Sequence, residues 1–265
     1  MDRVDLHSGA AGHRGECCLS RRRQIGRRAR EEQAHRDSQI RFNRVVLKSM
    51  DPGSHGVKRR YDASKRRESA RSRRRAVVVA AQQLFERDGF RATTLAAVAE
   101  RAGVSVKGLY NSFGSKADLA KAVFDFVIAG DDQPIPVAKR PEQLAMRAES
   151  EIHRKIEMFT RGLAHRQRRA AQVIILIRDG RHVDDSLAPV WDQLGAEALA
   201  GATIVGRDWL ATGELRAGIE LDEVRDVLAN YFRIDNYEWL VLQQGWTFER
   251  YTRWLGRTIV DALCR

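Results

Sequence analysis

Apolar residues follow helical spacing over most of this chain, but only after about residue 73. Residues 1–70 are rich in arginine, serine and glycine and show no sustained apolar periodicity. Such a composition cannot bury enough apolar surface to order the chain, so we expect a basic, largely disordered N-terminal extension. The first regular apolar stripe follows it and consists of Val77, Ala81, Leu84 and Phe85.

Glycines and hydroxyl side chains divide the next segment into short helices. Gly89 is expected to end the first helix, because glycine adopts the left-handed conformation of a helix end at little cost. Thr94, Ser105 and Ser115 are predicted N-caps of further helices, the first two of which are separated by Gly103. The residues predicted to face inward are Leu95, Val98, Ala99, Ala102, Leu109 and Phe113.

The remaining chain carries further helical stripes and no strand-type alternation. A loop with three prolines is expected at residues 131–141. Beyond it, we predict helices over the ranges 141–162, 168–179, 186–211, 221–243 and 247–263. The pattern therefore predicts an all-α fold of about nine helices.

The two helices on either side of Gly103 have the pattern of a helix-turn-helix. Ala99 is small enough to let the helices approach closely, and Gly103 supplies the positive φ that the turn requires. Val104 and Leu109 hold the second helix against its domain, which leaves its outer side free to enter a DNA major groove. We therefore expect an N-terminal three-helix helix-turn-helix DNA-binding domain, followed by a larger C-terminal helical domain.

The charge distribution supports a nucleic-acid partner. Residues 1–75 contain 22 lysines and arginines against 9 acidic residues, whereas the rest of the chain contains 25 against 26. The excess positive charge, which makes the whole chain +12, therefore lies beside the predicted DNA-binding helices. The arginine run from Arg71 to Arg75 is either a solubilising flank or an arm that grips phosphates or enters a minor groove.

Several other functional classes find no support in the sequence. The cysteines lack metal-ligand spacing and a disulfide framework, and His182 has no second neutral ligand at helical spacing. No set of nucleophile, base or metal ligands converges, so we expect no enzyme, no cofactor and no metal. The longest apolar run, residues 173–177, is far too short to span a membrane, and the N-terminus lacks a signal peptide. We expect a cytoplasmic, nucleoid-associated protein.

Four segments within residues 77–121 carry a family resemblance. They read LFERDGF, TTLAAVAERAGVS, GLYNSF and SKADL, with a fixed spacing between Tyr110 and Phe113. This arrangement resembles the DNA-binding domain of TetR-family (tetracycline-repressor-like) transcriptional regulators. The division that the resemblance implies is an extension at 1–70, a helix-turn-helix domain at 71–120 and a regulatory and dimerisation domain at 121–265.

The resemblance also implies roles for individual residues. Val106–Gly108, at the start of the recognition helix, would contact bases, and Tyr110 would press against the DNA backbone. Thr94 and Lys116, at helix starts, would hold phosphates, which helix N-termini favour in any case. The full DNA-binding set is Thr94, Ser105, Val106, Lys107, Gly108, Tyr110, Asn111, Ser112 and Lys116.

Two features of this set leave alternatives open. Relatives often carry threonine or serine where Gly108 stands, so a hydroxyl contact to phosphate is expected to be missing there. Tyr110 has the alternative of a core-edge aromatic residue, and Lys107 and Lys116 have that of ordinary solvated lysines.

The C-terminal helices are expected to hold an effector and a dimer interface. Apolar residues around Val173–Ile177 and Val190–Leu210 predict an apolar or aromatic small-molecule ligand, with one or two of the tryptophans facing it. The predicted helix 221–243 is apolar nearly all round, which requires burial on both sides. The resemblance implies that it forms a homodimer interface with the aromatic stripe of helix 247–263; packing within the chain is the alternative.

These expectations combine into one function and one alternative. We expect a sequence-specific transcriptional regulator, a repressor that a small molecule releases from a palindromic double-stranded DNA operator. The alternative is a structural DNA-binding protein that uses its basic arm without reading sequence. Residues 1–49 are either part of the protein or a mis-assigned extension upstream of an initiating Met50.

Overall fold

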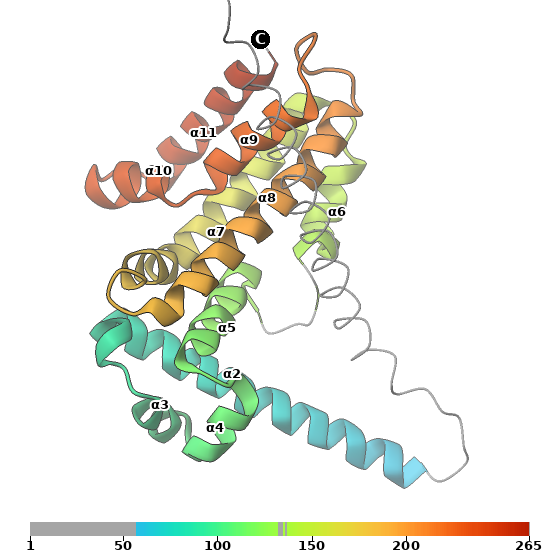
Figure 1. Ribbon diagram of the computed structural model, residues 1–265. Helices are drawn as coiled ribbons and strands as arrows, with labels where there is room; N and C mark the ends of the chain where they lie inside the picture. Colours follow the sequence, from blue (N-terminus) through green and yellow to red (C-terminus); the bar gives the residue numbers. More distant parts are fainter. Residues whose placement is uncertain (1–56, 132–134, 136, 265) are drawn as a thin grey trace, which may run out of the picture. The chain divides into compact units, whose positions relative to one another are not determined.

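The computed structural model describes residues 57–131, 135 and 137–264, which contain helices and no strand. The predicted all-α fold is confirmed (Figure 1). None of the described helices is both long and apolar enough to cross a membrane. In chain order the elements are α2 (Val57–Ala92), α3 (Leu95–Ala102), α4 (Val106–Phe113), α5 (Lys116–Ala129), the 3-10 turn η1 (Val137–Lys139), α6 (Pro141–Ala148), α7 (Ile152–Gly180), the 3-10 turn η2 (Asp185–Leu187), α8 (Ala188–Leu210), α9 (Leu221–Phe232), α10 (Asp235–Tyr237), the π-helical η3 (Glu238–Gln243) and α11 (Phe248–Leu263).

Helix α2 begins well before the first apolar stripe. It starts at Val57, so the expectation of disorder is wrong for residues 57–70. Lysine, arginine, alanine and glutamate are good helix formers, and the packed apolar half of α2 supplies the nucleus from which a basic flank extends. The backbone leaves the helical conformation at Gly89, with φ 79° and ψ 170°, where the sequence predicts the helix to end. Residues 1–56, and with them the question of Met50, lie outside the described residues.

The long helix α7 replaces two predicted helices. No break occurs between residues 162 and 168, because Leu163, Ala164 and Gln167 continue the buried stripe of a single 29-residue helix. The break comes earlier, between α6 and α7. There the buried Lys155 ammonium donates to the carbonyl oxygens of Met146 and Arg147 at 3.2 and 3.0 Å, and so satisfies the open end of α6.

Helix α9 ends eleven residues before the predicted boundary at Gln243, at Phe232. The Gln167 side-chain amide donates to the carbonyl oxygens of Tyr231 and Arg233, both at 3.0 Å, and its own oxygen accepts from the Tyr251 hydroxyl at 2.9 Å. A buried partner on α7 therefore replaces the helical hydrogen bonds that the chain gives up at this bend.

Two apolar clusters hold residues from Asp62 onward together. The first joins α2, α3, α4 and α5 to the C-terminal half of α7 and the start of α8, and the second joins α7, α8, α9 and α11. Helix α5 runs from the short helices up to α7 (Figure 1). The predicted domain boundaries after residues 70 and 120 fall inside α2 and α5, and the division into domains stays a prediction.

Candidate DNA-binding surface and ligand cavity

The turn between α3 and α4 is built by local hydrogen bonds. Thr94 Oγ1 accepts from the backbone N–H of Ala97 at 3.1 Å, which makes Thr94 the N-cap of α3. Gly103 ends α3 with φ 65°, and its N–H donates to the carbonyl oxygen of Glu100. Ser105 Oγ then accepts from the N–H of Gly108 at 3.0 Å. The caps and the left-handed glycine are therefore those that the sequence predicts.

The two faces of α4 differ as a recognition helix requires. Leu109 and Phe113 face the core with 1% and 8% of their surface exposed. On the other side, Val106 is 41% and Tyr110 52% exposed, and Lys107 is exposed beside them. The alternative that Tyr110 is a core-edge residue does not fit this exposure. The outer face of α4 is free to meet a major groove.

The hydroxyl groups of the predicted DNA-binding set differ in whether their hydrogen is still available for a bond to phosphate. Thr94 and Ser105 use an oxygen lone pair for capping, so each keeps its O–H hydrogen for donation. The Ser112 hydroxyl already donates its hydrogen to the Gly108 carbonyl oxygen at 2.8 Å. A Cβ on Gly108 would lie 3.0 Å from Ser105 Oγ, so glycine is the residue that best fits this cap. Asn111 is exposed.

The Lys116 side chain binds the backbone of the turn before α3. Its ammonium donates to the carbonyl oxygens of Phe90 at 2.9 Å and Thr93 at 3.2 Å, and lies 3.5 Å from that of Arg91. It also lies 4.3 Å from the centroid of the Phe90 ring. Since an ammonium has three donors, this side chain holds the turn between α2 and α3, and its donors are engaged there rather than free for a phosphate.

Arg74 is a residue of this region whose role the sequence did not reveal. Its Nη1 donates to the Ser112 carbonyl oxygen at 3.1 Å, and its guanidinium carbon lies 4.3 Å from the centroid of the Phe113 ring. A cation at the C-terminal end of α4 is favourable to the helix dipole. Within the arginine run, Arg74 therefore fastens α2 to the recognition helix rather than serving as a solvated flank.

A cavity of about 450 Å³ lies between α5, α6, α7, α8 and the end of α9. This volume is within the range of small-molecule sites. Its lining includes Ile174 from the apolar segment around 173–177 and several residues from the segment around 190–210, among them Trp191 and Leu194. Other apolar lining residues are Phe124, Ile128, Phe159 and Leu163.

Most charged groups on the cavity wall are neutralised by neighbours. Asp208 Oδ2 lies 2.9 Å from Lys155 Nζ, and Glu197 Oε1 lies 3.1 Å from Lys121 Nζ. Arg233 Nε lies 3.0 Å from Asp235 Oδ2. The cavity thus offers a ligand mainly apolar surface.

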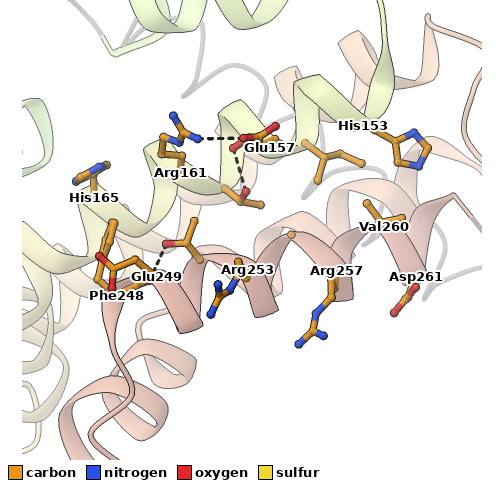
Figure 2. Close-up of a pocket in the computed structure, with 14 residues that line it drawn as sticks. His153, Glu157, Arg161, His165, Phe248, Glu249, Arg253, Arg257, Val260 and Asp261 are labelled. Atoms are coloured by element: carbon orange, nitrogen blue, oxygen red, sulfur yellow. Dashed lines mark hydrogen bonds and ion pairs between the residues drawn. The ribbon is translucent and has the colours of Figure 1, made fainter.

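A second, more open hollow of about 640 Å³ lies between α7 and α11. Figure 2 shows His153, Glu157, Arg161 and His165 on its α7 side, with Arg253, Arg257 and Asp261 on α11. Arg161 Nη2 donates to Glu157 Oε1 at 3.0 Å (Figure 2). Its charged rim suits an apolar ligand less well than the cavity does. Among the described residues, no group of three or more histidine, cysteine or acidic side chains is arranged to hold a metal ion.

The aromatic stripe of α11 packs within the chain. Tyr251, Leu255 and Ile259 have 0% of their surface exposed, so they belong to the intrachain core. The exposed apolar residues in this region are instead Trp239, at 56%, and Leu242, at 44%, both on η3. The expectation that the α11 stripe forms a dimer interface is therefore contradicted. The apolar residues left exposed for such an interface lie on η3.

Three polar residues of α7 stand at helical spacing among apolar residues in the sequence. The spacing alone does not say what these polar side chains do. Lys155 and Gln167 are 3% and 2% exposed, and Arg166 lines the cavity. Each stands at helical spacing among apolar neighbours such as Phe159 and Leu163. A polar residue on an apolar stripe marks either a buried hydrogen-bond partner or a site residue, and only the fold distinguishes them.

Comparison with known proteins agrees with this geometry. The family model described as "Bacterial regulatory proteins, tetR family" matches residues 77–123. A search of curated proteins finds no match. Among solved structures, a TetR-family regulator from Rhodococcus sp. is 16% identical with a TM-score of 0.57, over 72% of this chain and 98% of its own.

Two further solved regulators have the same fold. FadR from Bacillus subtilis, solved with stearoyl-CoA, is 14% identical with a TM-score of 0.55, over 71% of this chain and 97% of its own. A transcriptional regulator from Saccharomonospora viridis, solved with choline, is 14% identical with a TM-score of 0.53, over 72% and 97%. Residues 77–123 therefore match the tetR family of bacterial regulatory proteins, and the described part of the chain has the fold of solved regulators.

Proposed function

We propose that this chain is a sequence-specific transcriptional repressor that binds a palindromic operator as a homodimer, in the cytoplasm at the nucleoid. The observation that carries the proposal is the exposed outer face of α4, where Val106, Lys107 and Tyr110 lie on a helix held by buried Leu109 and Phe113. Val106–Gly108 would read bases, Tyr110, Thr94 and Ser105 would contact the backbone, and Asn111 would add a polar contact. No enzymatic step is part of the proposal.

The dimer follows from the need to place two recognition helices on one face of DNA. A palindromic operator presents half-sites about 34–36 Å apart, which a two-fold symmetric pair of chains matches. Trp239 and Leu242 are large apolar residues exposed on η3, and burial against a second copy would remove them from water.

A ligand in the 450 Å³ cavity would act on DNA binding through α5. Leu119 and Val123 of this helix are buried in the cluster that includes the helix-turn-helix, while Phe124 and Ile128 line the cavity. Regulators of this fold have been solved with stearoyl-CoA and with choline, which supports a small-molecule effector here. The ligand would release the operator only to the extent that it binds better to the conformation with low DNA affinity.

Genome-wide mapping of bound sites, followed by footprinting, tests the proposal. One or a few short palindromic sites are the expected result, and Tyr110→Ala should weaken binding to them without lowering the melting temperature, because Tyr110 is 52% exposed. The second candidate is a structural DNA-binding protein, favoured by the exposed basic residues Lys65, Arg66, Arg67, Arg73 and Arg75 of α2. Uniform coating of DNA, with no protected palindrome, would establish that candidate and refute the proposal.

A further inference from the structure

Arg166 of α7 lies where two hollows of the structure meet. One is the apolar cavity of about 450 Å³, and the other is a groove of about 720 Å³ along α6 and α7. Both are lined by Ile128, Val137, Gln143 and Arg166. The groove lining contains five arginines against three glutamates. The apolar cavity and the charged groove therefore adjoin, and Arg166 lines both of them.

Arg166 differs from Arg140, Arg161 and Arg169 of the groove because none of the described residues pairs with it. Arg140 is paired with Asp131 at 2.7 Å, and Arg161 with Glu157 at 3.0 Å. Arg169 donates to the carbonyl oxygens of Val127 and Ile128, both at 3.0 Å. Within the part of the chain that the structure describes, no hydrogen bond or ion pair engages Arg166.

The surroundings of Arg166 are unfavourable to its charge. Burial and then the charge of Arg169 lower its pKa to about 10, with Glu142 acting in the opposite direction, so Arg166 remains a cation near pH 7. A cation that is partly removed from water and left unpaired destabilises the fold. Gly162, one turn earlier on α7, leaves space beside the guanidinium, since a Cβ there would lie 3.1 Å from Arg166 Nη1.

We propose that the ligand is an amphiphile whose anionic head binds Arg166 and whose apolar tail fills the 450 Å³ cavity. This inference rests on the proposed ligand-responsive function and names the chemical class of its effector. A guanidinium binds carboxylate or phosphate oxygens through paired N–H donors, and the tail would contact Phe159, Leu163 and Trp191. The head would lie one helical turn from Arg169, which holds the last carbonyl groups of α5.

Calorimetric titration of the full chain without DNA tests the proposal. The probes share a decyl tail and differ in the head: decanoate, decyl phosphate, decan-1-ol and decyltrimethylammonium, each below its micellar concentration. At least one anion should bind about tenfold or more tightly than decan-1-ol, and the two anionic arms distinguish a carboxylate from a phosphate head. Equal affinity for decan-1-ol and both anions, or a preference for the cation, would overturn the proposal.

Substitutions at Arg166 separate the head contact from the tail contact. Arg166→Gln should remove the preference for anions and leave decan-1-ol affinity unchanged, while Arg166→Lys should keep part of the preference. The unliganded melting temperature of Arg166→Gln should stay level or rise, because an unpaired charge is removed. The matched control is Arg161→Gln, in the same groove but paired with Glu157, which should bind the probes as the unaltered chain does.

Three outcomes decide between this inference and the function on which it rests. A preference for anions that persists in Arg166→Gln refutes the inference; if that variant does not fold, Arg166→Met and Arg166→Lys give the same comparison. Arg166-dependent anion binding in a chain that protects no operator would support the inference and refute the proposed repressor. Operator protection without any anion preference would support the proposed repressor and refute the inference.

Discussion

Replacement of Lys116 by methionine distinguishes a structural lysine from a phosphate contact. The substitution keeps the aliphatic stem and removes the ammonium that donates to the Phe90 and Thr93 carbonyl oxygens at 2.9 and 3.2 Å. Hydrogen bonds from a charged donor contribute about 1.5–3 kcal/mol each when lost in buried surroundings. Because Lys116 is only half-buried, we expect a total loss of about 2 kcal/mol. For a chain of this size that corresponds to a melting temperature lower by about 4–8 °C.

Denaturant and thermal unfolding measure this loss, and operator titrations across a salt series measure the phosphate contact. Lys116→Met should leave the slope of log affinity against log salt unchanged. Lys107→Met is the matched control: this lysine is exposed on the outer face of α4, so its loss should flatten the slope by about 0.9 without changing stability. Unchanged stability of Lys116→Met together with a flatter salt slope would refute the structural role.

Three further predictions follow from the same geometry. Phe113→Ala should destabilise the chain by about 3–5 kcal/mol in denaturant unfolding, since Phe113 is 8% exposed and contacts Arg74; a loss under 1 kcal/mol would contradict its core position. Removal of residues 1–49 should change operator affinity little, whereas removal of residues 1–70 should flatten the salt slope by about two to four units, and identical slopes would show that the basic segment does not touch DNA. Trp239→Glu should yield monomers in sedimentation, and a wild-type chain that is monomeric at micromolar concentration would refute the proposed dimer.

The helix-turn-helix could be predicted from the sequence because its determinants are local. The caps at Thr94 and Ser105 and the left-handed turn at Gly103 act through bonds that span three to five residues, so the residue pattern alone specifies them. The buried positions of Leu109 and Phe113 follow from the same short-range periodicity.

Tertiary structure decided what depends on residues distant in the chain. Helix α9 ends at Phe232 because Gln167, more than sixty residues earlier, supplies the hydrogen bonds at the bend. The Lys116 ammonium binds the carbonyl oxygens of Phe90 and Thr93, which lie more than twenty residues earlier in the chain. Arg166 falls between two helices that the sequence predicts, and only the continuous helix α7 and the packing of α5, α6 and α8 around it make the hollow in which no described residue pairs with its charge. The orientation and the neighbours of a side chain depend on which distant segments pack against it. Periodicity along one helix carries no information about those segments.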